Sequence, residues 1–345
     1  MKWFFDYRLP FACDYFHRTF AAITTDGSLF ISLAGIPSLG CLMNSTGLVM
    51  FLALTGIFEP SAIQQLPDGR FLVAEDEKEH PFALVTLQPD GAIRSVPLEL
   101  DSENAAKLDD LEGLSLDAQG NLYAITSHSR NSKGEEKKSR DKLLRFRVEG
   151  NRMVFPVVLT GLKSALAAAH PVLAESATVL DVKADGGLNI EALEMAPDGQ
   201  HLLIGLRSPL LEGKAILACL DNPATAFDSS AALRISPALV TLDLGGQGLR
   251  TLSWIPVLNG YLLVSGPIAK EQRQFRLWFW SGHSNDKPRE AHVQGLAGFE
   301  HTEGATPAII AGQPKIVFVS DDGSRAEGRP ARFLLLDSEQ IRIEP

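Results

Sequence analysis

The chain has 345 residues, of which 45% are hydrophobic, enough for a buried core in one large all-β or barrel domain or in two ordinary domains. Its 42 Asp and Glu residues outnumber 32 Lys and Arg residues, which gives a net charge of -10. An acidic chain repels a phosphate backbone unless its basic residues cluster, so we expect no nucleic-acid partner. The three cysteines are far apart and have no CxxC spacing, which indicates neither a disulfide framework nor a zinc site.

The first 57 residues are partly apolar but are interrupted by Gly, Pro and Asn. No uninterrupted run there reaches the ~18 residues that a membrane-spanning helix needs, so we predict no transmembrane segment. The start also lacks the short basic lead and clean apolar run of a signal peptide. We therefore interpret residues 1–20 as an irregular extension or a misassigned start and residues 21–345 as one domain. A cytoplasmic location is the default expectation, with a periplasmic or secreted location as the alternative.

Five stretches of the sequence repeat one pattern, in which a charged residue precedes a short apolar alternation, a Gly or Asn turn and a second apolar run. The three clearest copies begin at Glu59, Leu111 and Ile190, and two weaker copies begin at Gly248 and Thr302. Another candidate strand follows each copy. Three or four strands in each repeat are typical of a propeller blade, so we predict an all-β fold, a β-propeller.

Tight turns separate the two apolar runs of the repeats: PDG at 67–69, AQGN at 118–121, PDG at 197–199 and NG at 259–260. Gly and Asn accept the positive φ of such turns, which indicates that each blade opens with an antiparallel hairpin. Residues 20–57 offer one more hairpin-like turn within ITTDGSLFISL. We therefore predict six blades, with five as the alternative.

Two insertions interrupt the repeats. The Ala-rich and Leu-rich stretch GLKSALAAAHPVLAES predicts a helical insertion near residues 162–176. The run RNSKGEEKKSRDK at residues 130–142 is charged and contains no apolar residue, which is typical of a solvated loop between the second and third strands of a blade. Since this loop begins at the channel rim, the alternative is a lid over the channel.

In a propeller blade, the first strand starts and the second strand ends at the same rim of the central channel. These positions are 16 residues apart in the repeats, so we expect Glu112 near His128 and Glu191 near Arg207. The alternative is that these are ordinary solvated strand ends around a water-filled channel. The polar residues expected at the rim are Glu59, Glu75, Asp76, Glu112, His128, Arg130, Glu191, Arg207, Arg250, Glu303, Asp321 and Asp322.

Four pairs of motifs resemble the bacterial domain of unknown function 3616 family, DUF3616, over residues 57–345. They are EPSAI with LVAEDE, DDLEGLS with ITSHSRN, GLNIEALEMAPDG with LLIGLRSPL, and GQGLRTLSWIP with YLLVSGP. This resemblance implies a β-propeller without an established activity, and it implies no catalytic residue. The LEG, IEA and TEG openings also look like those of phytase-like and esterase-like propellers.

One hypothesis for the rim is a metal-assisted hydrolase of a phosphoester, an ester or a lactone. Glu59, Glu112, Glu191 and Glu303 would hold Ca²⁺ or a similar hard cation through oxygen ligands. His128 would act beside Glu112 as the general base, because its ordinary pKa lies near neutrality. Four carboxylates in one ring repel each other unless a cation or nearby arginines neutralise them, and the sequence leaves both possibilities open.

The first alternative hypothesis is a propeller that binds a small anionic or sugar-like ligand without catalysis. Arg130, Arg207 and Arg250 would supply guanidinium donors, which suit carboxylate and phosphate oxygens, and Asp76 and Asp322 would complete the site.

The second alternative is a protein-interaction scaffold, for which RQFRLWFWSG at 273–282 is the candidate apolar surface. The alternation in that segment favours a core strand. We expect a monomer that takes a small molecule as its ligand.

Overall fold

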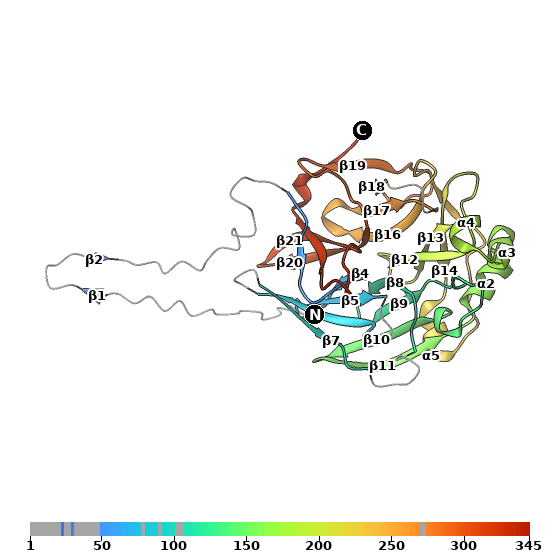
Figure 1. Cartoon of the computed structure of the whole chain (residues 1–345), viewed down its shortest axis with the longest axis horizontal. Coiled ribbons are helices and arrows are strands. Elements are labelled where there is room, and N and C mark those ends of the chain that lie inside the picture. The colour runs from blue at the N-terminus through green and yellow to red at the C-terminus, as the bar shows by residue number, and fades with distance from the viewer. Residues whose placement is uncertain are drawn as a thin grey trace, which may run out of the picture. The chain divides into compact units, whose positions relative to one another are not determined.

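Five antiparallel sheets, the blades of a β-propeller, account for most of the structure (Figure 1). This structure is a computed structural model, which describes residues 22–23, 29–30, 49–76, 80–88, 92–100, 107–269 and 274–345. Blades 1 to 5 are numbered in chain order of their innermost strands. These innermost strands, β4, β8, β12, β16 and β20, each contact the next and form a closed ring.

The strands of each blade run outward from this ring. Blade 1 contains β4 (Pro60–Gln65), β5 (Phe71–Glu75), β6 (Phe82–Leu87) and β7 (Ile93–Pro97). Blade 2 contains β8 (Leu111–Leu116), β9 (Leu122–Thr126), β10 (Leu143–Glu149) and β11 (Arg152–Leu159). Blade 3 contains β12 (Asn189–Met195), β13 (Leu202–Ser208), β14 (Ala215–Leu220) and β15 (Val240–Leu242).

The last two blades each include a strand from a distant part of the chain. Blade 4 contains β16 (Gly248–Ile255), β17 (Gly260–Gly266), β18 (Arg276–Trp280), β19 (Arg289–Val293) and the C-terminal β23 (Ile341–Ile343). Blade 5 contains β20 (Thr302–Ile310), β21 (Gln313–Ser320), β22 (Ala331–Leu336) and β3 (Leu52–Leu54). Because β3 pairs with β22, the early part of the chain closes the ring onto its last blade.

The prediction of six blades is wrong, because residues 20–57 do not form a blade of their own in the described structure. Their last part is β3, the outer strand of blade 5. The hairpin expected in ITTDGSLFISL does form, as β1 (Ala22–Ile23) paired antiparallel with β2 (Leu29–Phe30), within the separate unit Met1–Ser38. Residues 1–20 lie outside the described residues.

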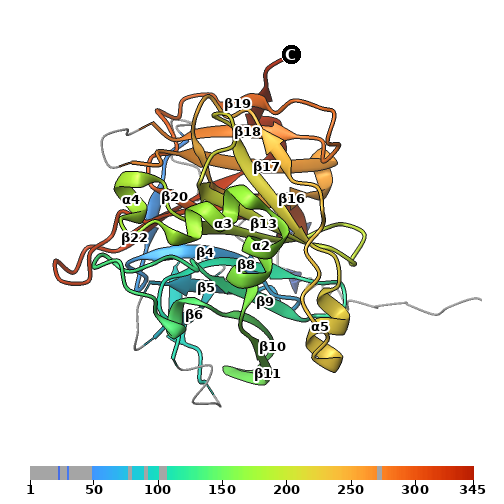
Figure 2. The same ribbon diagram turned by 90° about the vertical axis from the view of Figure 1, so that its right-hand side faces the viewer.

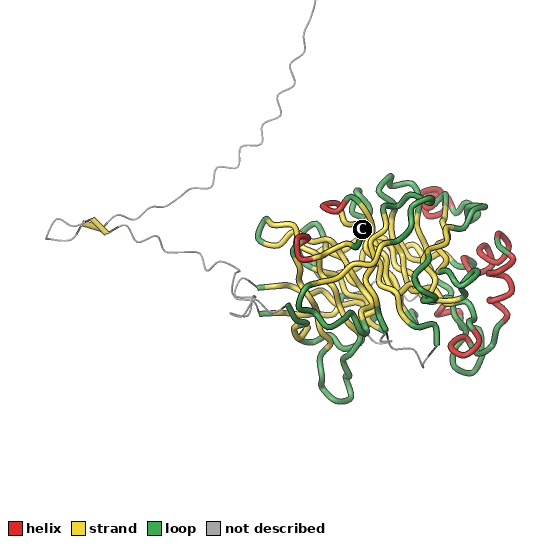
Figure 3. Tube along the Cα trace, turned by 90° about the horizontal axis from the view of Figure 1, so that it is seen from above, coloured by secondary structure: helices red, strands yellow, loops and turns green. Residues whose placement is uncertain are grey.

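Short helices lie outside the sheets (Figure 3). The helical insertion predicted near 162–176 is confirmed by the first two of three α-helices between blades 2 and 3, which group on one side of the ring (Figure 2). Within the described residues, no helix is long and apolar enough to cross a membrane. The α-helices are α2 (Leu162–Ala169), α3 (Pro171–Thr178), α4 (Val182–Asp185) and α5 (Pro223–Ser229); the 3-10 helices are η2 (Lys138–Arg140), η3 (Pro256–Leu258) and η4 (Ser338–Gln340).

Apolar side chains fill the space between every two neighbouring blades. One buried cluster occupies each of the five gaps, for example around Phe82 and Phe146 between blades 1 and 2. The candidate interaction segment at 273–282 contributes β18, whose Leu277 and Trp280 are buried. The prediction of a core strand there is therefore confirmed.

Every innermost strand contains a β-bulge near its beginning, where its pairing with the second strand of the blade shifts by one residue. A bulge re-aims the extra side chain and often lies next to a functional site. The bulged residues of blades 1 to 5 are Ser61, Glu112, Glu191, Arg250 and Glu303.

Small residues directly after two of these bulges let neighbouring inner strands approach closely. A Cβ atom on Gly113 would lie 2.9 Å from the backbone nitrogen of Leu193 in the next blade. A Cβ atom on Gly304 would lie 3.0 Å from the Cα atom of Ala62. The LEG and TEG motifs are therefore required for packing at the ring as well as for placing an acidic residue.

The buried carboxyl group of Glu194, near the end of β12, joins three neighbouring blades. Glu194 accepts hydrogen bonds from the Trp254 backbone N–H of blade 4 at 2.9 Å and from the Ser115 hydroxyl of blade 2 at 3.2 Å. Burial raises the pKa of Glu194 to about 8, although both hydrogen bonds oppose the shift. The packing of the blades is thereby linked to the protonation of this side chain.

Candidate functional site

A cavity of about 990 Å³ lies where the inner strands begin. Nine Asp and Glu residues and six Lys and Arg residues line it. Further along the inner strands, the channel narrows to a void of about 10 Å³, room for about one water molecule. Apolar residues such as Leu114, Leu193 and Leu252 line this void. The cavity therefore has a nearly closed floor.

Four of the five bulged residues have ionisable side chains, and all five line the cavity. Three of them form one ion-pair network: Arg250 Nη1 lies 2.8 Å from Glu191 Oε2, and the Arg250 guanidinium donates two hydrogen bonds to Glu303. These three side chains are at most 11% exposed. The two carboxylates hold the pKa of Arg250 above its ordinary value despite burial. Arg250 thus occupies the position between Glu191 and Glu303.

Glu191 has further partners within its own blade. Arg207 Nη1 donates to Glu191 Oε1 at 3.1 Å, and Asn189 Nδ2 donates to the same oxygen at 2.8 Å. Arg207 Nε donates to the Pro267 carbonyl at 2.9 Å, which fixes the guanidinium. The predicted proximity of Glu191 and Arg207 is therefore confirmed.

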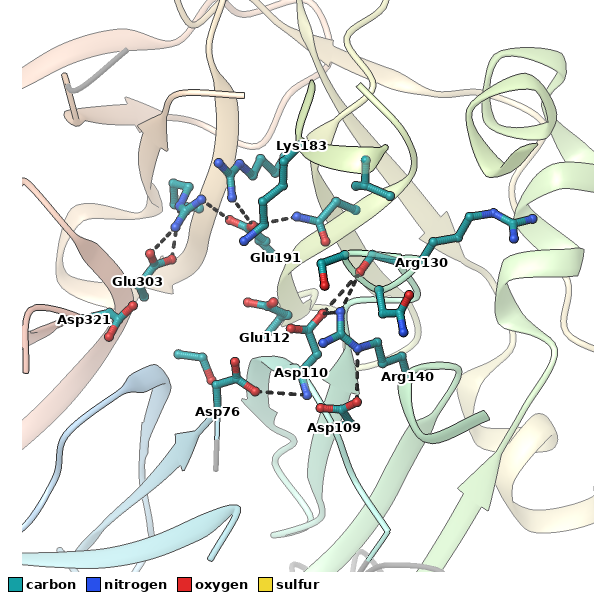
Figure 4. A pocket seen from close by; sticks show the side chains of 18 of the residues that line it. Asp76, Asp109, Asp110, Glu112, Arg130, Arg140, Lys183, Glu191, Glu303 and Asp321 are labelled. Atoms are coloured by element: carbon teal, nitrogen blue, oxygen red, sulfur yellow. Dashed lines mark hydrogen bonds and ion pairs between the residues drawn. The ribbon is translucent and has the colours of Figure 1, made fainter. Parts of the chain in front are cut away.

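Glu112 differs from Glu191 and Glu303, the other acidic bulged residues, because its side chain makes no hydrogen bond or ion pair with any residue that the structure describes. Figure 4 shows its carboxyl group inside the cavity, with no dashed line reaching it. Burial and the nearby carboxylates of Glu191, Asp110 and Glu303 raise its pKa well above the ordinary value, against the opposing effect of Arg250. We conclude that Glu112 is the ring member most strongly favoured in the protonated, neutral form.

A second group of carboxylates lies beside the ring (Figure 4). Arg140 pairs with Asp109 at 3.2 Å and with Asp110 at 2.9 Å. Asp76 Oδ1 accepts the Asp110 backbone N–H at 3.2 Å. Burial and the charges of Asp110 and Asp109 raise the pKa of Asp76 to about 6. Burial and the neighbouring Glu59 likewise raise the pKa of Asp321 to about 6.

The structure does not place His128 beside Glu112. Blade 3 has a longer first turn than blade 2: Ala196 N–H donates to His201 O, five residues on, whereas Asp117 N–H donates to Asn121 O, four residues on. Counting 16 residues on from Glu112 therefore reaches His128, which lies one position beyond the equivalent of Arg207 in blade 3. A change of one position turns a side chain to the opposite face of a strand. His128 is buried outside the cavity lining, with its Nε2 3.3 Å from Asp141 Oδ1.

Two acidic positions of the expected rim also differ from the repeat alignment. Ser61, not Glu59, holds the bulge position of blade 1, although Glu59 lines the cavity two residues earlier. Asp322 accepts hydrogen bonds from Ser320 at 2.9 Å and from Arg332, and it does not line the cavity. Its neighbour Asp321 lines the cavity instead.

The expected calcium site is not supported by the arrangement of its four glutamates. In the described parts of the chain, no group of three or more His, Cys, Asp or Glu residues is arranged to hold a metal ion. Arg250 neutralises Glu191 and Glu303 directly. Of the two ways to neutralise the ring that the sequence left open, the structure uses the arginine.

Several cavity residues come from segments that the repeat does not cover. The loop at 127–142 contributes Arg130 and Arg140, and α4 contributes Lys183. Arg130 pairs with Glu136 at 2.9 Å within its own loop. The charged run at 130–142 was the feature of the sequence that could have indicated this part of the cavity lining.

Gly248 positions Arg207 and gives a stability prediction. A Cβ atom on Gly248 would lie 1.9 Å from the Arg207 carbonyl oxygen. We expect Gly248→Ala to lower the free energy of unfolding by about 1–3 kcal/mol or more, because backbone must shift to admit the methyl group. Gly199→Ala is the control: its Cβ meets nothing within 4 Å, so its cost is the strain of φ +66°, about 1–2 kcal/mol, and Gly248→Ala should lose more than this. Thermal unfolding of both variants tests this, and equal losses would contradict it.

Residues 177–308 match a protein family of unknown function, DUF3616. This part of the chain is similar to that family. The DUF3616 match spans blade 3, the first four strands of blade 4 and most of β20, and so includes the ion-pair network of Glu191, Arg207, Arg250 and Glu303. It confirms the resemblance for this segment of the predicted 57–345. No curated protein sequence matches the chain.

Solved structures show only distant likeness. A putative oxidoreductase (glucose dehydrogenase) from Thermus thermophilus is 15% identical with a TM-score of 0.41, and the alignment covers 84% of this chain and 100% of that one. The PQQ-bound aldose sugar dehydrogenase of Streptomyces coelicolor is 13% identical with a TM-score of 0.40, covering 86% and 97%. A GH43 β-1,3-galactosidase is 10% identical with a TM-score of 0.44, covering 85% and 98%. These values are too low to carry an argument about the site.

Proposed function

We propose that the cavity binds a small, uncharged, hydroxyl-rich ligand of the sugar-like class. The observation that carries this proposal is the pairing of the basic residues that line the cavity. Five of the six, all except Lys183, already contact a carboxylate of the protein. The cavity therefore offers a ligand chiefly oxygen acceptors and neutral donors.

The paired arginines argue against an anionic ligand. Arg207 and Arg250 are held by Glu191, and Arg130 is held by Glu136. A phosphate or carboxylate ligand would have to displace these partners and would also meet the excess of carboxylates in the lining. The same pairing removes the need for a metal ion at Glu191 and Glu303.

The remaining polar groups suit hydroxyl groups, which both donate and accept hydrogen bonds. Glu59 and Asp321 offer carboxylate oxygens that have no ion-pair partner among the described residues, and a protonated Glu112 offers a donor. The volume of about 990 Å³ lies at the upper end of the range of ~300–1,000 Å³ that is typical of small-molecule sites.

A ligand screen of the wild type, compared with a variant whose cavity is blocked, tests the proposal. At saturation a hydroxyl-rich ligand present at about 100 times its Kd should stabilise the protein by about 2.7 kcal/mol. Neutral sugars and polyols should raise the melting temperature, whereas sugar phosphates and sugar acids should not. Ala184→Trp, on the cavity wall, should abolish the shift, and Ala168→Trp, on α2 away from the cavity, should keep it. A shift with sugar phosphates alone would overturn the proposal.

A second candidate function is hydrolysis in which Glu112 donates a proton to a leaving group. Its unpaired, protonated carboxyl inside the cavity is the observation that favours this role. Glu112→Gln keeps a hydrogen-bond donor but has no acidic proton. It should therefore retain binding of the ligand found in the screen and lose any turnover of the corresponding glycoside, ester or lactone. Turnover by the Gln variant at the wild-type rate would exclude this role.

A further inference from the structure

The short helix α4, in the connection between blades 2 and 3, forms one wall of the cavity. At its start, Asp181 Oδ1 accepts the Ala184 N–H at 3.0 Å, and at its end Gly186 has a φ of 70°. Val182 is 8% exposed and anchors the helix in the protein. The backbone of α4 is therefore held at both ends, and it presents Lys183 at the cavity.

Lys183 is the one basic residue of the lining that contacts no carboxylate among the described residues. Figure 4 shows it among the lining side chains, with no dashed line reaching it. Its side chain is exposed. An ammonium group has three N–H donors and no acceptor. Lys183 can therefore donate to a molecule in the cavity without giving up a contact within the protein.

The side of the cavity across from α4 offers acceptors. Asp321 follows β21 of blade 5, and Glu59 precedes β4 of blade 1. In a closed ring of five blades, the connection between blades 2 and 3 lies opposite blade 5, and Figure 1 shows α4 and β21 on opposite sides of the ring. Burial and Glu59 raise the pKa of Asp321 to about 6, so above this pH its carboxylate only accepts hydrogen bonds.

We propose that Lys183 is the specificity-determining residue of the cavity, because it donates to an acceptor oxygen of the ligand while Glu59 and Asp321 accept from the ligand's hydroxyl groups. This proposal rests on the proposed binding function and adds an orientation to it. The ligand is a sugar-like molecule with an oxygen free to accept at the end that faces α4. Its hydroxyl donors face blades 1 and 5.

One free ammonium group does not make the cavity an anion site. Glu59 and Asp321 face the same space without an ion-pair partner among the described residues. An anionic ligand would gain a charge-assisted contact with Lys183 but would be repelled by these carboxylates. A neutral acceptor oxygen takes the hydrogen bond from Lys183 without that repulsion.

Binding measurements on Lys183→Met test the contact. The probes are glucose, galactose, maltose and glucitol, and Kd is measured for the probe that most raises the melting temperature of the wild type. Met keeps an unbranched side chain but has no N–H donor, so Kd should rise about 10- to 100-fold, the range for a hydrogen bond to a charged group. Lys183→Arg keeps the charge and the donors and should recover most of this loss.

Lys287→Met is the matched control, since it removes the same charge from an exposed residue outside the cavity lining. It should bind the probe as the wild type does. Without probe, all three variants should melt with the wild type, because neither lysine has an ion-pair partner among the described residues. Acetylation by acetic anhydride is a second readout: the probe should slow acetylation of Lys183 and leave that of Lys287 unchanged.

The outcomes distinguish this proposal from the binding function on which it rests. If no probe raises the melting temperature of the wild type, both are overturned. If Ala184→Trp abolishes binding but Lys183→Met binds as tightly as the wild type, the cavity binds the sugar and only the role of Lys183 is overturned. Binding of glucose 6-phosphate or gluconate that requires Lys183, without binding of any neutral probe, would assign an anion site and overturn both.

Discussion

Glu191→Gln should destabilise the protein by about 3–5 kcal/mol, because it removes one partner of a buried ion-pair network. Arg207 would lose its ion pair with residue 191, and Arg250 would keep only its ion pair with Glu303. The new amide group would also point a donor at a guanidinium donor. For a chain of this size the loss corresponds to a melting temperature lower by about 5–8 °C at neutral pH.

Glu112→Gln is the matched control, since it changes the equivalent bulge residue of the neighbouring blade. If Glu112 is already neutral in the folded protein, the amide replaces a carboxylic acid of nearly the same shape, and the change should stay within about 1 kcal/mol. Thermal unfolding of both variants measures the difference. A large loss of stability in Glu112→Gln, together with a similar loss when a chelator is added to the wild type, would instead support a bound cation. That result would revive the metal hypothesis.

The repeats of the sequence predict the propeller because each blade is built from local hairpins. Alternating apolar residues and Gly or Asn turns specify strand pairs such as β8 with β9 within about 16 residues. The number of blades depends instead on long-range pairing. The Leu52–Leu54 strand carries no local signal for its partner Ala331–Leu336, and so the six-blade count failed at that point.

Some of the residues that line the cavity were predicted from the repeats, for the same reason. Alignment on acidic residues found Glu112, Glu191 and Glu303, but in blade 1 it selected Glu59 where the bulge places Ser61. A one-residue difference in turn length displaced His128. These errors are small along the sequence but decide which face of a strand a side chain occupies.

The pairing of charges was the feature that the sequence left undecided. Composition alone shows arginines and glutamates at similar positions, and it is the geometry that places Arg250 between Glu191 and Glu303 while Glu112 stays unpaired. Among the ligands considered from the sequence, that asymmetry is the reason for proposing the sugar-like one rather than an anion or a metal ion.

The protein should lose stability as the pH rises from about 5 to about 8. The pKa of Glu194 is raised from 4.5 to about 8 and that of Glu303 to about 7, in both cases chiefly by burial. A carboxyl group with a raised folded pKa contributes stability that is complete below the unfolded pKa and is lost as the pH rises through the folded pKa. Asp68 and Asp198, whose pKa values are lowered by their hydrogen bonds, act oppositely, but only below their ordinary value of 3.8. His128, whose pKa burial lowers, also acts oppositely, below its ordinary value of 6.5.

Glu194→Gln isolates the part of this pH dependence that comes from Glu194. The shift to about 8 corresponds to an upper limit of about 5 kcal/mol, since one pKa unit is ~1.4 kcal/mol. Gln can accept from Trp254 N–H and donate to Ser115 without ionising, so the variant should match the wild type near pH 5 and melt several degrees higher, about 5 °C, above pH 8. Glu149→Gln, at an exposed strand end, should follow the wild type throughout. A Glu194→Gln melting curve that falls with pH as steeply as the wild type would show that Glu194 is ionised in the folded protein and that its contacts across three blades, rather than its proton, hold it in place.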